Sequence, residues 1–264
     1  MQLDPVAIRA GVRLEAFDTL GSTNAEALAR ARAGARGPLW LVAQRQTAGR
    51  GRRGRAWASP PGNLYATLLT TDPSPARRAA ELSFVAALAI HDAIVEIAPD
   101  LASAPHLPAA PDRVPRLALK WPNDVLVDGA KVAGILIEGE SGPPLAVAVG
   151  IGVNCAHHPA AVEFPATDLA AARVSIMPDR LLRALSRTML GRIGQWAGGQ
   201  GFASIRAEWL DRATGLGAPI RVAIGDAALE GRFDRLDAAG HLVLGLPDGT
   251  TRTIAAGDVF PVPA

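Results

Sequence analysis

The sequence predicts an α+β protein in which a larger domain of strands and helices, residues 1–214, precedes a small all-β domain, residues 215–264. Two observations support this division. In the larger part, short β-forming runs alternate with stretches of helical period, of which 76–97 is the longest. After Gly215-Leu-Gly217 the pattern changes to short strands separated by turns, which is typical of a small barrel.

The part before residue 98 is expected to contain three helices and three strands. Thr23 followed by Glu26 has the spacing of a capping box and predicts a helix start at this point. Apolar residues recur at helical spacing after residue 76 and predict a helix that faces the core. In order, the expected elements are helix 5–11, strand 14–20, helix 25–32, strands 39–44 and 64–69, and helix 76–97.

The second half is expected to begin with a loop, because residues 98–116 carry five prolines among alanines. Asp128-Gly129 between two β-forming runs predicts a tight hairpin. The expected elements are strands 117–120, 124–127, 131–138 and 145–153, helices 178–195 and 202–213, and strands 220–224, 229–236, 241–246 and 251–254.

Composition excludes several classes of protein. The chain has 264 residues, 49% of them hydrophobic, which is enough for a substantial core. Its net charge of +2 is too small for a general nucleic-acid surface, and its 13 N-terminal residues are too few for a helix-turn-helix module. The single cysteine, Cys155, excludes an intrachain disulfide or a multi-cysteine zinc site, and we interpret it as a core residue rather than a nucleophile. Without an apolar run long enough to span a membrane or a signal sequence, the protein is expected to be cytoplasmic.

The most unusual segment is Gln46-Thr-Ala-Gly-Arg-Gly-Arg-Arg-Gly-Arg-Ala-Trp57, called here the arginine loop (residues 46–57), in which glycines alternate with four arginines. Guanidinium groups suit phosphate, and glycines let the backbone approach a ligand. A nuclear localisation signal or an RNA-binding tail has a similar composition. Since this segment lies between two expected strands, we interpret it as an anion-binding loop inside a folded domain that orders on binding.

Only two of the 27 basic residues are lysines, Lys120 and Lys131. Both lie in one region, in Lys120-Trp-Pro-Asn-Asp124 and Lys131-Val-Ala-Gly134. A compact ammonium can enter a narrow pocket and meet a carboxylate or phosphoryl oxygen end on. We therefore expect both lysines to occupy positions where a guanidinium would not serve. Chance survival of two lysines is the alternative.

Two further groups of polar residues can each have either of two roles. Ser22 and Thr23 can cap the helix that follows or bind a polar ligand group, because helix starts present free N–H groups. Asn154 ends the run Gly150-Ile-Gly-Val-Asn154, where its amide could read an adenine edge or simply form a turn.

Taken together, the chain closely resembles the biotin protein ligases, also called biotin–[acetyl-CoA-carboxylase] ligases. The resemblance is carried by five motifs in the family's order: Gly21-Ser-Thr-Asn24, the arginine loop, Lys120-Trp-Pro-Asn-Asp124, Lys131-Val-Ala-Gly-Ile135 and Gly150-Ile-Gly-Val-Asn154. It implies a mixed β-sheet flanked by helices, like class II aminoacyl-tRNA synthetases and biotin/lipoate ligases, with a C-terminal SH3-like barrel. It also implies that biotin and ATP form biotinyl-5′-AMP, from which a lysine of a biotin carboxyl carrier protein takes the biotinyl group.

The resemblance also implies roles for individual residues. Lys131 and Arg50 would be catalytic. Biotin would be bound by Ser22, Thr23, Asn24, Gln46, Gly49, Arg50, Lys131 and Gly134. The nucleotide would be bound by Arg52, Arg55, Trp57, Asn123, Asp124, Asn154 and Asp168. Family members often place serine where this chain has Asp168, and Asp124 is the one candidate ligand for Mg²⁺.

The resemblance further implies ATP, Mg²⁺ and biotin as reactants, a carrier protein as partner, no DNA or membrane partner, and a monomer or homodimer. A lipoate protein ligase of the same fold is the nearest alternative. A non-catalytic nucleic-acid binder that uses the arginine loop is an alternative from another class, and its binding would depend strongly on salt.

Overall fold

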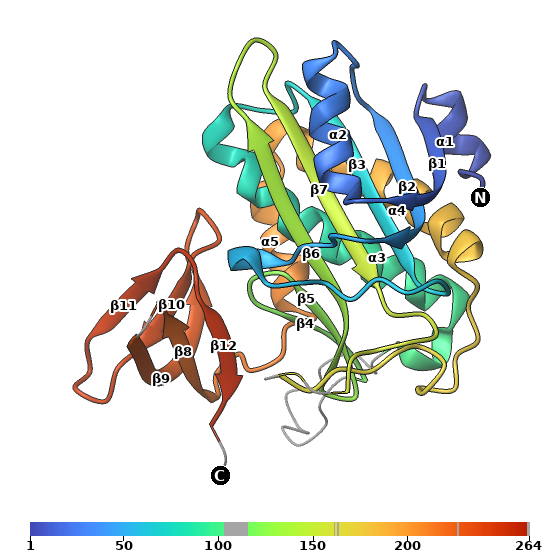
Figure 1. Cartoon of the computed structure of the whole chain (residues 1–264). Coiled ribbons are helices and arrows are strands. Elements are labelled where there is room, and N and C mark those ends of the chain that lie inside the picture. Colours follow the sequence, from blue (N-terminus) through green and yellow to red (C-terminus); the bar gives the residue numbers. More distant parts are fainter. Residues whose placement is uncertain (103–115, 161, 163, 226, 263–264) are drawn as a thin grey trace.

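A computed structural model of the chain describes residues 1–102, 116–160, 162, 164–225 and 227–262. Its main feature is a seven-stranded sheet with the strand order β1-β2-β3-β7-β6-β5-β4 (Figure 1). Only β1 and β2 pair in parallel and all other pairs are antiparallel, which confirms the expected mixed sheet. The strands are β1 Arg13–Leu20, β2 Leu39–Gln46, β3 Leu64–Thr71, β4 Leu117–Lys120, β5 Asp124–Val127, β6 Ala130–Glu140 and β7 Ala146–Val153.

Helices cover both faces of this sheet, with α2 on one face and α3 and α4 on the other (Figure 1). The alternation along β2 explains the arrangement, since Leu39 and Leu41 pack in the small core under α2, and Trp40 and Val42 pack in the main core. The α-helices are α1 Pro5–Arg9, α2 Thr23–Arg32, α3 Leu82–Ile97, α4 Pro178–Trp196 and α5 Phe202–Leu210.

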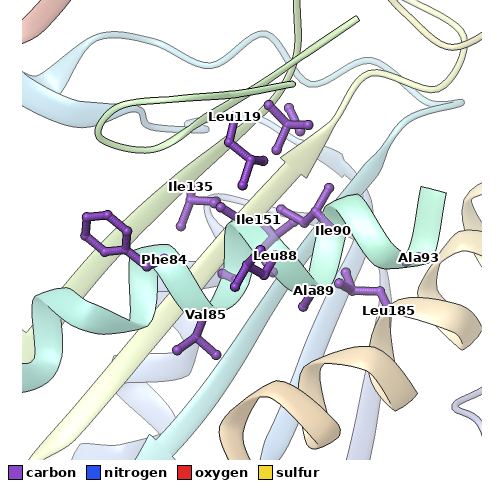
Figure 2. Packing of buried hydrophobic residues seen from close by; sticks show 14 of the residues in the cluster. Phe84, Val85, Leu88, Ala89, Ile90, Ala93, Leu119, Ile135, Ile151 and Leu185 are labelled. Carbon is purple, nitrogen blue, oxygen red and sulfur yellow. The ribbon is translucent and has the colours of Figure 1, made fainter. Parts of the chain in front are cut away.

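Helix α3 is the centre of the main core. Figure 2 shows Phe84, Val85 and Leu88 of α3 among side chains from the sheet, including Ile135 and Ile151. The expected apolar stripe is confirmed, but the buried surface is wider than one stripe because α4 and α5 also pack on α3. Helix α3 therefore fills the face of the sheet opposite α2.

The C-terminal part forms a five-stranded antiparallel sheet with the order β11-β10-β9-β8-β12 and the expected SH3-like fold. Within the described residues, no strand pair joins the outer strands β11 and β12. Trp121 donates a hydrogen bond from Nε1 to the Gly240 carbonyl (3.0 Å), which ties this sheet to the larger domain. The strands are β8 Pro219–Ile224, β9 Ala227–Leu236, β10 Leu242–Gly245, β11 Thr251–Ile254 and β12 Asp258–Pro261.

Several expected elements differ in detail. The N-cap of α2 is Ser22 instead of Thr23, so the expected capping box with Glu26 does not form. Residues 76–81 form a 3₁₀ helix ahead of α3. The expected loop 98–116 begins with a 3₁₀ turn at Pro99–Leu101, and its residues 103–115 lie outside the described residues. The sequence analysis also missed β12, a four-residue strand that contains a proline.

The hairpin expected at Asp128-Gly129 is confirmed. Both residues have positive φ, 49° and 80°, as a type I′ turn requires. Strand β6 therefore starts at Ala130 and brings Lys131 beside β5.

Candidate active site

The motif residues meet in one cleft of about 260 Å³. Its walls come from the start of α2, the arginine loop, the 120–124 segment, β6, β7 and β12. Thirteen of the residues expected in the site line it: Ser22, Thr23, Asn24, Gln46, Arg50, Arg52, Arg55, Trp57, Asn123, Asp124, Lys131, Gly134 and Asn154. Gly49 and Asp168 do not.

One end of the cleft holds a partly buried polar network. Thr23 donates from its backbone N–H (2.8 Å) and its hydroxyl (3.1 Å) to Oε1 of Gln46. Oγ1 of Thr67 lies 2.8 Å from the Thr23 hydroxyl, and Nε2 of Gln46 donates to the Ser59 hydroxyl (3.0 Å). Because Ser22 is the N-cap of α2, Thr23 does not cap the helix and instead orients the amide of Gln46. The network offers both donors and acceptors to a polar ligand.

Asn24 extends this network across the sheet. Its Nδ2 donates to Oε2 of Glu138 (2.9 Å) and to the Leu136 carbonyl (3.2 Å). A Cβ at Gly150 would lie 2.3 Å from Oδ1 of Asn24, so only glycine lets this side chain lie against β7. Glu138 also lies 3.4 Å from a nitrogen of Arg50, which links the network to the arginine loop.

The arginine loop folds back on itself through a bridge between Arg50 and Ala56. Its Trp57 ring lies against Gly134 and Gly152, a registered pair on β6 and β7, where added Cβ atoms would lie 3.0 and 2.6 Å from the ring. The two glycines therefore create the slot for the indole. Gly49, near the start of the loop, also allows a close approach, because a Cβ there would lie 2.6 Å from the Ser59 hydroxyl and from the Trp57 carbonyl.

Both lysines of the chain contact one carboxylate. Nζ of Lys120 lies 2.9 Å from Oδ2 of Asp124, and Nζ of Lys131 lies 2.6 Å from Oδ1. Burial alone would raise the pKa of the Asp124 carboxyl, but the two ammonium groups outweigh burial and hold the pKa below its usual value. The Asp124 carboxyl is therefore ionised at neutral pH, and two ammonium groups beside one carboxylate leave one positive charge in the cleft. The Lys120 ammonium also lies 4.1 Å from the ring centre of Phe164.

The cleft contains functional candidates that the sequence analysis did not assign to the site. Lys120 was singled out as a lysine but received no role, whereas Asp258 and Phe260 lie on the unpredicted strand β12. Asp258 lies 3.6, 3.2 and 2.8 Å from nitrogens of Arg52, Arg53 and Arg55. No local signal identified it, because an aspartate after a glycine in a β-rich tail is usually a turn residue.

Arg52 connects three parts of the cleft. Its Nη1 donates to Oδ1 of Asn123 (3.1 Å) and to the Gly257 carbonyl (3.2 Å), beside Asp258. Burial lowers the pKa of the Arg52 guanidinium, partly offset by the charges of Asp258 and Asp124. This side chain joins the arginine loop, the 120–124 segment and the C-terminal sheet.

Of the expected nucleotide-binding residues Asn154 and Asp168, only Asn154 lines the cleft. The Asp168 carboxylate accepts from the Ala171 N–H (2.7 Å) and lies 2.6 Å from Nδ1 of His158. Burial would raise the pKa of Asp168, but these two contacts hold it below its usual value. Asn154 lines the cleft and donates from Nδ2 to the Thr167 carbonyl (3.0 Å). The carboxylate of Asp168 is thus engaged by Ala171 and His158 and does not line the cleft.

The donor set does not form a metal cage. Within the described residues, no three His, Cys, Asp or Glu side chains are grouped as metal ligands. Both oxygens of Asp124, the expected candidate, already contact ammonium groups. The Asp124 carboxylate therefore does not fit Mg²⁺ in this arrangement.

Two other observations limit the chemistry. Cys155 is buried, and burial raises the pKa of its thiol to about 12, so its thiolate is not available as a nucleophile at neutral pH. In the part of the chain that the structure describes, no helix has the length and apolarity to cross a membrane.

Comparison with known proteins gives a consistent picture. Residues 21–154 match the biotin/lipoate A/B protein ligase family, and residues 215–260 match the biotin protein ligase C-terminal domain. The chain is 45% identical over 247 residues to a biotin–[acetyl-CoA-carboxylase] ligase of Paracoccus denitrificans, covering 90% of this chain and 96% of the relative. It is 35% identical over 253 residues to the Mycobacterium tuberculosis protein of the same name, covering 94% and 88%.

Solved structures share the fold. The biotin protein ligase from Aquifex aeolicus in complex with biotin and ATP has a TM-score of 0.74 at 24% identity, covering 94% of this chain and 97% of that chain. The biotin protein ligase from Leishmania major in complex with biotinyl-5-AMP has a TM-score of 0.61 at 26% identity, covering 92% and 99%.

Proposed function

The chain belongs to the biotin/lipoate A/B protein ligase family, and from this premise we propose the reaction that its cleft performs. The chain is an ATP-dependent ligase that joins biotin to a lysine of a biotin carboxyl carrier protein through biotinyl-5′-AMP. One observation carries the assignment: the arginine loop, both lysines and the Thr23–Gln46 network line one cleft.

Charge in the cleft favours the first step. A carboxylate oxygen of biotin attacks the α-phosphorus of ATP, and pyrophosphate leaves, so two anions must approach each other. Among the described residues that line the cleft, five are basic (Arg50, Arg52, Arg55, Lys120 and Lys131) and two are acidic (Asp124 and Asp258). This surplus offsets the repulsion between the substrates, and fixed charges need no reorganisation when the bond forms.

Lys131 and Arg50 act at the reacting atoms. Lys131 is anchored by Asp124 on one side and by the Trp57 ring, 5.3 Å from its Nζ, on the other. Its ammonium is thereby positioned to stabilise charge on the acyl and α-phosphoryl oxygens. In the second step a lysine amine of the carrier attacks the acyl carbon and AMP leaves, so neither step needs a covalent enzyme nucleophile.

The polar network selects the vitamin. The ureido group of biotin has two N–H donors and one carbonyl acceptor, and Thr23 and Gln46 present complementary groups in a partly buried position. The dithiolane ring of lipoate has no N–H or carbonyl group and would not form these hydrogen bonds. The network therefore favours biotin over lipoate as the substrate.

Mg²⁺ enters with the nucleotide. Mg²⁺ is commonly bound through substrate phosphates with few protein carboxylates. Two ammonium groups share the carboxylate of Asp124, so this carboxylate is not a ligand of the metal, and the substrate is Mg²⁺–ATP. Assembly as a monomer or homodimer stays a prediction.

Pyrophosphate exchange tests the proposal. Purified protein with ATP and labelled pyrophosphate should form labelled ATP when biotin is present and not when lipoate replaces it. Addition of an apo carrier protein should then yield biotinylated carrier, while a carrier whose acceptor lysine is replaced by arginine should stay unlabelled. Exchange that depends on lipoate would support the related ligase instead. Salt-sensitive nucleic-acid binding without any exchange would support the non-catalytic alternative.

A further inference from the structure

Three arginines of the arginine loop converge on one carboxylate from the far end of the chain. Asp258, the first residue of β12, lies 2.8 Å from Arg55, 3.2 Å from Arg53 and 3.6 Å from Arg52. Its side chain is only 18% exposed, so water screens these pairs less than fully exposed ones. Arg52 adds a hydrogen bond to the neighbouring Gly257 carbonyl.

The loop needs such an anchor to hold its shape. Its guanidinium groups repel one another, and Arg53 has a φ of 56°, a left-handed conformation that residues other than glycine rarely adopt. Among the described residues, Asp258 is the acidic side chain that pairs with both Arg52 and Arg53. One carboxylate therefore offsets both the repulsion and the strained backbone.

We propose that Asp258 is a positioning residue, which holds the arginine loop folded over the cleft before ATP arrives. The C-terminal sheet is then part of the nucleotide site. Each guanidinium has about five N–H donors, whereas one carboxylate accepts about four hydrogen bonds. Donors of Arg52 thus remain for phosphate oxygens while Asp258 stays in place. If Asp258 instead competed with the phosphates for the arginines, removal of its charge would strengthen ATP binding.

Limited proteolysis tests the positioning without any substrate. Trypsin cleaves after arginine and needs a mobile segment, so the rate of cut at Arg50 and Arg55 reports how firmly the loop is held. The variant Asp258→Asn keeps the shape of the side chain and removes its charge. It should increase the rate of cleavage in the loop about tenfold, as expected for the loss of several partly screened ion pairs.

Asp234→Asn is a matched control. Asp234 lies in the same C-terminal sheet, is 17% exposed and pairs with Arg232, also in that sheet. It should leave the rate of cleavage in the loop unchanged. Arg53→Gln tests the same contact from the other side, because Arg53 pairs with Asp258 but does not line the cleft. It should loosen the loop less than Asp258→Asn does, because it removes one of the three ion pairs, and the double variant should be cleaved at about the rate of Asp258→Asn.

Kinetics then separate positioning from competition, and this part rests on the proposed function. In biotin-dependent exchange, Asp258→Asn should raise KM for ATP about tenfold with a smaller change in KM for biotin, and Asp258→Glu should restore part of the loss. A lower KM for ATP, or loop cleavage unchanged in both Asp258→Asn and Arg53→Gln, would overturn the inference. If the wild-type protein lacked exchange, the proposed function would fail, while the proteolysis result would still decide the role of Asp258.

Discussion

Truncation of Lys131 separates what this side chain does for catalysis from what it does for the fold. The Lys131 ammonium lies 2.6 Å from Oδ1 of the buried Asp124 and 5.3 Å from the centre of the Trp57 ring. Lys131→Ala removes a cation from the site and one of two counterions of Asp124. Its side chain is 25% exposed and belongs to neither core, so no core volume is lost.

The expected magnitudes differ for the two effects. Loss of one preorganised charge at the reacting oxygens costs about 3–4 kcal/mol, or at least a hundredfold in rate. Removing the sole partner of a buried charge would cost about 3–5 kcal/mol of stability. Because Lys120 remains 2.9 Å from Asp124, we expect about 1–2 kcal/mol instead, which lowers Tm by a few degrees.

The sign of the pH dependence follows from the pKa of Asp124. This pKa is held below its usual value in the folded protein, so Asp124 stabilises the fold above its unfolded pKa and loses that contribution as pH falls through the folded pKa. Lys131→Ala removes one of the groups that lower it. Acid unfolding of the variant should therefore begin at higher pH than in the wild-type protein, as measured by circular dichroism.

The assay is biotin-dependent exchange between ATP and pyrophosphate, with circular dichroism to show that the variant is folded. Lys131→Arg serves as the charge-matched comparison and should also be impaired, because a guanidinium cannot meet Asp124 end on as an ammonium does. Exchange at the wild-type rate in a folded Lys131→Ala protein would refute the catalytic role. Full activity in Lys131→Arg would refute the interpretation of the two lysines.

Three further outcomes are expected. Gly150→Ala should lower the free energy of unfolding by about 1–3 kcal/mol and weaken biotin binding in calorimetry, because its Cβ would lie 2.3 Å from Oδ1 of Asn24; an unchanged melt would contradict this contact. Cys155 should resist iodoacetamide at pH 8 in the native protein and react in urea, since its thiol pKa is about 12. Self-biotinylation should be slight by mass spectrometry, as Lys120 and Lys131 are the chain's two lysines and both ammonium groups contact Asp124; extensive labelling would count against this.

The sequence predicted those parts of the site that are encoded locally. Motifs in the family's order placed the arginine loop and Lys131 at the cleft, and the hairpin at 128–129 follows from residues that tolerate positive φ. The choice between Ser22 and Thr23 as the cap was not predictable, because it depends on Gln46 from β2. Asp258 was missed for the same reason, since its partners lie about 200 residues away.

The cleft carries a surplus of positive charge. The chain as a whole has a net charge of +2, whereas the described residues that line the cleft include five basic and two acidic side chains. Their surplus of three positive charges exceeds the net charge of the chain, +2, so the rest of the molecule is close to neutral. Each of the two acidic groups is shared by several cations: Asp124 fixes both lysines, and Asp258 contacts three arginines. Each carboxylate thereby holds cations together against their mutual repulsion and still leaves positive charge for two anionic substrates.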